Sequence, residues 1–185
     1  MHNLRKWQQR VRVSSPKERR LANVLVKMGE TCDSLNLSKN VLETASMIYR
    51  NLDGHVDVKG KSVVSITAAT IYMACKQCDV VRSLEEICRG ICPAKDVKSK
   101  TKLASRYYRT MVMEMGQVVA PVVTMDKYIS KIANMTQTEV RVERLALELA
   151  EKTKDSNIAD GKSPNGIAAA YLYVSSVLLG QNVLQ

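Results

Sequence analysis

The stretch KGKSVVSITAATIYMACK, residues 59–76, decides the fold because its pattern returns near the C-terminus. The second copy, residues 160–176, reads DGKSPNGIAAAYLYVSS, and matching residues lie 101 positions apart. In both copies a glycine, a lysine and a serine precede a segment in which small and apolar residues occupy every side. That pattern predicts a buried helix. We therefore expect a tandem repeat in which each copy is the central helix of its own bundle.

Each copy opens with a glycine turn, at Gly60 and at Gly161, that should start its helix. Ser62 and Ser163 are placed as N-caps, where a hydroxyl accepts a hydrogen bond from an otherwise unpaired backbone N–H. Pro164 then fits the first helical position. A chance match between two alanine-rich core helices is the alternative. Turn, cap and a following tyrosine keep one register in both copies, which favours a true repeat.

The length of 185 residues and a period near 100 favour two small domains over one large one. Hydrophobic residues at 45% and charged residues at 25% are ordinary for a globular protein, and the absence of Phe fits an all-α fold with a core of Leu, Val, Ile and Met. We expect a basic arm at 1–14, a first repeat at 15–117, a linker at 118–123 and an incomplete second repeat at 124–185.

The net charge of +10 is unevenly distributed along the chain. Residues 1–20 carry +6, residues 21–58 carry −2, residues 59–116 carry +6 and residues 117–185 carry 0. The positive excess therefore lies on the N-terminal arm and on the second half of the first repeat. This distribution is typical of a protein that binds a polyanion such as nucleic acid. A basic surface that only confers solubility is the alternative.

The odd number of cysteines argues against a disulfide framework. The five are Cys32, Cys75, Cys78, Cys88 and Cys92. The pairs 75–78 and 88–92 have spacings that resemble the two halves of a zinc site. Both pairs fall on predicted helices rather than on tight turns, so we interpret the cysteines as core thiols and expect no metal.

Several function classes leave no signal in the sequence. No run of about 18 apolar residues is present, and the first residues do not resemble a signal peptide, so we expect a soluble, intracellular protein. His2 and His55 are the only histidines, and His55 lies in a predicted loop between acidic residues. A phosphate-binding glycine motif, a nucleophile elbow and a carboxylate or histidine cluster with metal spacing are all missing. We expect neither an enzyme nor a cofactor.

Capping boxes mark two further helix starts, at Ser15–Glu18 and Ser83–Glu86. The second begins a short helix that Gly90 should end, followed by a turn and a longer helix over roughly Lys98–Met115. This arrangement resembles a helix-turn-helix, whose second member would lie near DNA or a protein partner. Any helical hairpin with a basic face has the same pattern. Caps are also expected at Ser38, Thr124 and Thr138, with Asp53 and Gly54 ending the helix after Ser38.

Six stretches, in the same order along the chain, resemble one known family. They are LRKWQ at 4–8, GKSVVSITAATIYMACK at 60–76, RSLEEIC at 82–88, SRYYR at 105–109, DKYISKIAN at 126–134 and GKSPNGIAAAYLYVSS at 161–176. Together they resemble the core of archaeal transcription factor B and its eukaryotic relative, transcription factor IIB. The resemblance implies two tandem cyclin-like helical bundles. Against that pattern, we expect the second bundle to lack its last two helices and the chain to lack the N-terminal zinc ribbon. The loss of two helices should expose part of the apolar side of the helix at 163–179.

The resemblance also implies a function and a set of contacts. Such a protein is a general transcription initiation factor core, which binds the TATA-binding protein on promoter DNA and helps to recruit RNA polymerase. Carried onto this chain, it makes Lys59, Gly60 and Lys61 candidates for contact with DNA downstream of the TATA box. Candidates for acidic groups of the TATA-binding protein, or for nearby phosphates, are Lys98, Lys100, Lys102 and Arg106.

The positive charge of residues 59–116 agrees independently with that placement. A cyclin-like regulatory subunit that binds a kinase or another protein is the alternative function, because one fold serves several roles. The resemblance implies a nuclear location in a eukaryote, or a cytoplasmic and nucleoid location in an archaeon. It leaves the oligomeric state open.

Overall fold

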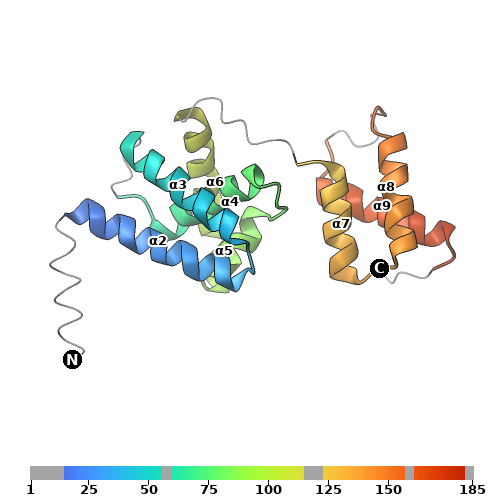
Figure 1. The fold of residues 1–185 in the computed structure, drawn as a ribbon, viewed down its shortest axis with the longest axis horizontal. Helices are drawn as coiled ribbons and strands as arrows, with labels where there is room; N and C mark the ends of the chain where they lie inside the picture. The colour runs from blue at the N-terminus through green and yellow to red at the C-terminus, as the bar shows by residue number, and fades with distance from the viewer. Residues whose placement is uncertain (1–14, 56–59, 115–122, 157–160, 182–185) are drawn as a thin grey trace. The chain divides into compact units, whose positions relative to one another are not determined.

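The computed structural model describes residues 15–55, 60–114, 123–156 and 161–181, and these are helices joined by turns, with no strand among them (Figure 1). The prediction of an all-α fold is confirmed. The chain divides into two compact units, residues 1–121 and 122–185. The predicted basic arm lies outside the described residues, as do Lys59 and nearly all of the predicted linker.

The first unit contains five α-helices in its described part, with α4 at the centre (Figure 1). They are α2 (Pro16–Ser34), α3 (Lys39–His55), α4 (Val63–Gln77), α5 (Leu84–Ile91) and α6 (Val97–Glu114), with a 3-10 turn, η1 (Ala94–Asp96), before α6. α4 contacts each of the other four α-helices. Every residue from 65 to 71 is buried, so the prediction of a central buried helix is confirmed for the first repeat.

Local hydrogen bonds explain where these helices begin. In the first capping box the Glu18 N–H donates to Ser15 Oγ at 3.2 Å, and the Ser15 N–H donates back to the Glu18 carboxylate at 3.1 Å. The box predicted at Ser83 and Glu86 has the same two bonds. Ser62 is the N-cap of α4, as predicted.

Two predicted helix ends in the first unit were too early. α5 includes Gly90 and ends at Ile91. A Cβ at Gly90 would lie 3.2 Å from the Leu35 side chain, so the glycine allows the close approach of α5 to the end of α2 instead of stopping the helix. α3 likewise continues past the predicted stop and ends at His55.

The second unit has three α-helices in its described part: α7 (Met125–Thr136), α8 (Val140–Lys152) and α9 (Pro164–Leu178). α9 contacts both of the others and runs across them in Figure 1. The buried core of the second unit is small, and consists of Ile129, Ala133, Val142, Ala146, Ala168 and Leu172.

The capping predictions were less accurate in this unit. Ser163 is the N-cap of α9 and Pro164 follows it as predicted, but the Ser163 hydroxyl makes no capping bond. Thr124 is the N-cap of α7, also without a side-chain bond. Thr138 is not a cap, because α8 begins at Val140 after Glu139. Instead the Thr138 hydroxyl lies 2.6 Å from the hydroxyl of Thr136.

The internal repeat is visible in the backbone at both ends of the central helices. Gly60 and Gly161, which precede α4 and α9, have φ angles of +77° and +71°. Asp79 and Gly180, which follow the two helices, have φ angles of +57° and +65°. Each pair is separated by the same 101 positions as the sequence match. The two copies therefore share their turn geometry as well as their residues.

The copies differ in how deeply their central helices are buried. Ala69 and Met73 of α4 are fully buried, whereas Val174, the counterpart of Met73, is 46% exposed in α9. The prediction that α9 is buried on every side was wrong. The reason is that α5 and α6 cover α4, while the described part of the second unit places only α7 and α8 against α9. The exposed apolar side expected for an incomplete bundle is present.

The cysteines agree with their interpretation as core thiols. Cys32, Cys75 and Cys88 are buried in the first unit, and Cys78 and Cys92 are half-buried. Burial raises the pKa of the Cys32 thiol to about 11 and that of the Cys75 thiol to about 12, so both are neutral near pH 7. Within the described residues, no group of three His, Cys, Asp or Glu side chains is arranged to hold a metal ion.

Candidate nucleic-acid interface

The turn that precedes α4 lies at the surface of the first unit. Gly60 is exposed, and a Cβ there would meet nothing within 4 Å, so its positive φ explains the glycine. Lys61 is half-buried and leads into Ser62, the N-cap of α4. Of the three residues predicted to contact DNA, Gly60 and Lys61 are therefore placed, and Lys59 lies outside the described residues.

Two side chains from other helices contact this turn. The guanidinium of Arg20 in α2 donates to the Lys61 carbonyl at 2.6 Å. The Ser62 N–H donates to Tyr107 Oη of α6 at 3.4 Å, and Lys61 Nζ lies 5.8 Å from the centroid of the Tyr107 ring. The second distance is within the range of a cation–π contact. Residues 60–62, which we call the Lys61 turn, are thus tied to α2 and α6.

Sequence reasoning missed both of these residues. Tyr107 lies within SRYYR, one of the stretches that carries the family resemblance, and Arg20 lies among the basic residues at the start of the first helix. Their positions beside these sequence features could have marked both residues as candidates. Their contact with the Lys61 turn could not be predicted, because it depends on how α2 and α6 pack beside α4.

Three of the four predicted residues on α6 share one face. An α-helix repeats every 3.6 residues, so Lys98, Lys102 and Arg106, four residues apart, follow one line along it. All three are exposed, and Arg109 continues the line. This face is opposite the buried one, which includes Ala104 and Met111. We call Lys98, Lys102, Arg106 and Arg109 the basic stripe.

The basic stripe carries charge that the described part of the chain does not neutralise. Among these residues no ion pair joins the stripe to a carboxylate, and the Arg109 guanidinium only donates to the Ser105 hydroxyl at 3.5 Å. At a rise of 1.5 Å per residue, the stripe extends roughly 16 Å along the helix. A row of cations of this length matches an extended polyanion better than a single ion.

Lys100, the fourth predicted residue, does not belong to the stripe. It is half-buried, and its carbonyl accepts a hydrogen bond from Ser65 Oγ of α4 at 3.3 Å. It lies seven residues before Tyr107 and therefore on the same face of α6. The four predicted residues thus divide between the solvent side of α6 and the side next to α4.

The comparisons with known proteins agree with this repeated architecture. Residues 17–101 and 119–182 each match the transcription factor TFIIB repeat. The chain belongs to the TFIIB repeat family. The Lys61 turn lies in the first matched TFIIB repeat, and α9 and the turn before it lie in the second.

Archaeal relatives match the chain over its whole length. It is 34% identical over 185 residues to a protein of Methanosphaerula palustris named Transcription initiation factor IIB, covering 100% of this chain and 53% of the relative. The protein of the same name from Archaeoglobus fulgidus is 35% identical over 185 residues, covering 100% and 55%. The chain therefore spans about half the length of the curated relatives it matches.

Among solved structures, the chain is similar to a chain of the yeast RNA Pol II CTD kinase complex. The sequence identity is 17%, and the match covers 91% of this chain and 57% of that one. The TM-score is 0.47, and a likeness of this degree supports no functional inference.

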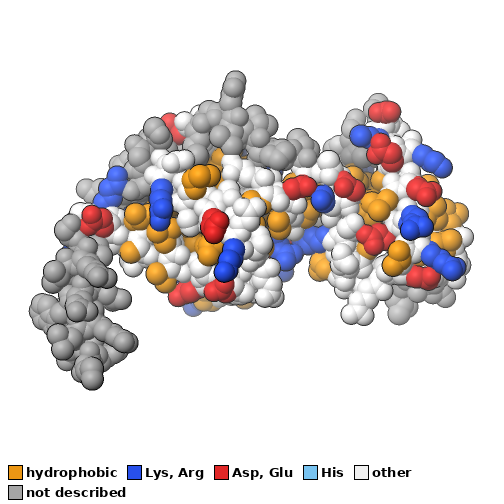
Figure 2. Space-filling model, in the orientation of Figure 1, with side chains coloured by type: hydrophobic (Ala, Val, Ile, Leu, Met, Phe, Trp, Pro, Cys, Tyr) orange, Lys and Arg blue, Asp and Glu red, His pale blue; other side chains and the backbone are white. Residues whose placement is uncertain are grey.

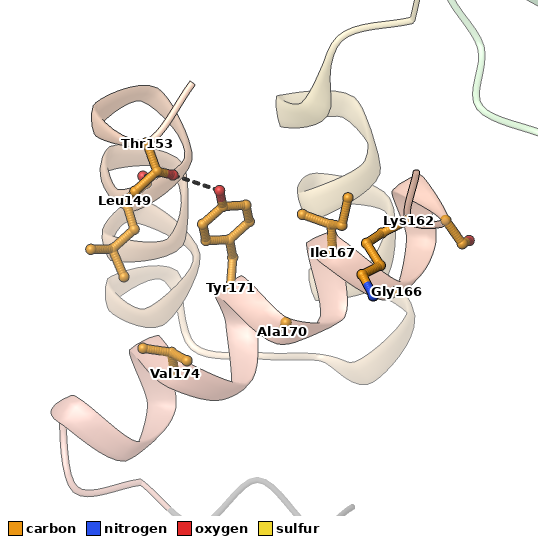
Figure 3. Close-up of a pocket in the computed structure, with 9 residues that line it drawn as sticks. Leu149, Thr153, Lys162, Gly166, Ile167, Ala170, Tyr171 and Val174 are labelled. Atoms are coloured by element: carbon orange, nitrogen blue, oxygen red, sulfur yellow. Dashed lines mark hydrogen bonds between the residues drawn. The ribbon is translucent and has the colours of Figure 1, made fainter. Parts of the chain in front are cut away.

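The two repeats present different surfaces. In the second repeat an apolar groove of about 580 Å³ runs along α9 and α8, and its lining includes Ile167, Ala170 and Val174 (Figure 3). Tyr171 and Thr153 close one side through a hydroxyl contact of 2.5 Å. Figure 2 shows basic and acidic side chains interspersed over this repeat. The second repeat therefore exposes an apolar groove and mixed charge, whereas the first exposes the basic stripe.

In the described part of the chain, no helix combines the length and the apolar character needed to cross a bilayer.

Proposed function

We propose that this chain is part of a general transcription initiation factor whose first TFIIB repeat binds promoter DNA together with the TATA-binding protein. The observation that carries the proposal is the basic stripe on α6, a helix that begins inside the first matched TFIIB repeat and continues beyond residue 101. The stripe has no neutralising carboxylate among the described residues. The relatives' name, Transcription initiation factor IIB, supports the same role. In the proposed role the factor acts inside the cell and also helps to recruit RNA polymerase.

Two parts of the first repeat have separate tasks in this proposal. The Lys61 turn, with Lys59 before it, contacts the backbone of DNA downstream of the TATA box. The basic stripe contacts acidic groups of the TATA-binding protein or phosphates beside it. Lys100 would contact such an acidic group or phosphate from the other side of α6, the side that carries Tyr107. In this proposal residues 15–117 are the first repeat, residues 118–123 are the linker, and residues 124–185 are the second repeat.

The binding energy in this proposal is mainly electrostatic. A lysine or arginine that neutralises a phosphate releases condensed counterions, and such contacts fix the register of a protein on DNA without reading its sequence. If about four cations each neutralise one phosphate, log K should fall with log salt at a slope of roughly −3 to −4. Affinity would then weaken alike on many promoters.

The test is a gel shift with TATA-box DNA across a salt series, with and without the TATA-binding protein. The double variant K98A/K102A should weaken the ternary complex and make the slope shallower by about 2 if both lysines contact phosphates. The control is R144A/K152A, which removes two exposed cations from α8 and should bind like the wild type.

Equal binding by the stripe variant and the control would contradict the proposed role of the stripe. A protein that forms no complex with DNA under any condition would contradict the whole proposal. The alternative role as a cyclin-like regulatory subunit requires no DNA and predicts that second outcome.

A further inference from the structure

The Lys61–Ser62 peptide group is held at both of its polar ends by side chains from other helices. Arg20 donates to its carbonyl at 2.6 Å, and its N–H donates to Tyr107 Oη at 3.4 Å. We propose that Arg20 and Tyr107 are positioning residues, which fix the Lys61 turn in the backbone conformation that meets a phosphate. This inference rests on the proposed function and adds to it two residues that do not themselves contact DNA.

The contact from Arg20 joins residues that are 41 positions apart in sequence. A hydrogen bond from a guanidinium to a carbonyl is charge-assisted and stronger than one between neutral groups. The Nε of Arg20 is buried and has no hydrogen-bond partner among the described residues. Partial burial of a cation is unfavourable unless another contact offsets it, so the bond to the Lys61 carbonyl accounts for the placement of this side chain.

Tyr107 contributes in two ways from the opposite side of the turn. Its hydroxyl accepts the Ser62 N–H, which fixes the plane of the peptide group. Its ring lies below the Lys61 ammonium, with 5.8 Å between Nζ and the ring centroid. The first contact orients the backbone and the second restricts the side chain that carries the charge.

The second repeat is an internal comparison. Its equivalent peptide group joins Lys162 to Ser163, and both residues are exposed. In the described part of that repeat no side chain donates to or accepts from this peptide group. The same glycine turn, with nearly the same φ angle, therefore forms without the two contacts. The contacts in the first repeat are not needed to make the turn, which points to a role in holding it still.

A turn that keeps its lysine but loses these contacts would have to be ordered when DNA binds. Ordering a loop on association lowers affinity without removing any ionic contact. Arg20 and Tyr107 therefore predict an effect on affinity at an unchanged salt slope. A direct phosphate contact by Arg20 predicts the opposite, because its loss would make the slope shallower by about 0.9.

The experiment measures ternary-complex affinity on TATA-box DNA across a salt series for R20A and Y107F, each alone and combined with K61A. R19A is the matched control, since Arg19 is the exposed neighbour and its loss changes the charge equally. Each positioning variant should weaken binding about two- to tenfold, as expected for the loss of one hydrogen bond, with the slope unchanged. In the K61A background neither should have a further effect. R19A should bind like the wild type.

A second measurement needs no DNA. Hydrogen exchange at the Ser62 amide should be faster in R20A and in Y107F than in the wild type, while exchange in the core of α4 stays the same. Y107F keeps the ring and its packing, so it remains informative if R20A folds poorly.

The outcomes separate the two proposals. Wild-type affinity for R20A and Y107F beside a weakened K61A would overturn the positioning role alone, as would unchanged exchange at Ser62. A shallower slope for R20A, additive with K61A, would make Arg20 a phosphate contact and would also overturn it. Wild-type affinity for K61A would overturn the role of the turn in DNA binding and, with it, the positioning of that turn for DNA.

Discussion

One substitution made at two equivalent positions should destabilise the first repeat and leave the second almost unchanged. Ala69 in α4 and Ala170 in α9 occupy the same place in the repeated pattern. Ala69 is fully buried where α6 crosses α4, close to the 3.3 Å bond between Ser65 Oγ and the Lys100 carbonyl. Ala170 is exposed and lines the groove of the second repeat. A leucine at each position therefore reports whether another helix covers that face.

The expected magnitudes follow from packing. A69L adds a branched side chain to a fully packed contact, and overpacking of this kind destabilises a core by about 1–3 kcal/mol. A170L places the same side chain in an open groove of about 580 Å³, so the stability of the second repeat should change by no more than about 0.5 kcal/mol. The same chemical change is thus predicted to differ several-fold in its effect.

Residue-resolved hydrogen exchange of the whole chain is the appropriate assay, because it reports the opening of each repeat separately. In A69L the slowest amides of α2–α6 should exchange about 5- to 150-fold faster, while those of α7–α9 stay unchanged. In A170L neither set should change appreciably. The reasoning would be refuted if A170L destabilised the second repeat as much as A69L destabilises the first, because the groove would then be filled. A neutral A69L would refute the packing of α6 on α4.

Two further predictions concern stability. Gln137 ends α7 in the left-handed region, at φ +50°, where a residue with a Cβ is strained. Q137G should therefore stabilise the second repeat by roughly 0.5–1 kcal/mol, measured by urea unfolding. The control N134G, inside α7, should not stabilise it. Burial holds the Cys32 and Cys75 pKa values at about 11 and 12, above the ordinary 9.0, which contributes stability below pH 9 that is lost as pH rises toward 12. Urea midpoints followed by circular dichroism should therefore fall less steeply over pH 9–12 in C75A than in the wild type, and identical slopes would contradict this reasoning.

The features that sequence reasoning predicted correctly depend on residues close together in the chain. The capping boxes at Ser15 and Ser83 each use two residues three positions apart, and both formed as predicted. The caps at Ser163 and Thr124 had the right position but no side-chain bond. The position was predicted correctly at these two caps but not at α8, whose N-cap is Glu139 rather than Thr138.

The candidate site shows the same limit. The period of an α-helix already places Lys98, Lys102 and Arg106 on one face and Lys100 on another, so this division could have been derived from the sequence. The bond between Arg20 and the Lys61 carbonyl could not, because it joins two helices whose packing no local pattern specifies. The exposed face of α9 was expected from the resemblance alone, since its apolar pattern matches that of a fully buried helix.

Lys76 of α4 lies in a cation–π cluster that distinguishes the first repeat from the second. The Lys76 ammonium lies 5.3 Å from the Tyr72 ring and 5.6 Å from the Tyr108 ring of α6, and the two rings are edge-to-face at 5.0 Å. Burial disfavours the charge, but the two tyrosines outweigh that effect and raise the pKa of Lys76. A cation–π contact between Lys76 and Tyr108 is therefore part of the packing of α6 on α4.

The second repeat has Val177 at the position of Lys76, while Tyr173 keeps the place of Tyr72. Val177 is 58% exposed, and it offers a covering helix an apolar contact with no cation. Exchange of equivalent helices between neighbouring repeats is a characteristic misfolding route of repeat proteins. If α6 docked on α9 it would lose the ammonium that its Tyr108 contacts. The cation–π cluster at Lys76 therefore favours packing of α6 on α4 over packing of α6 on α9.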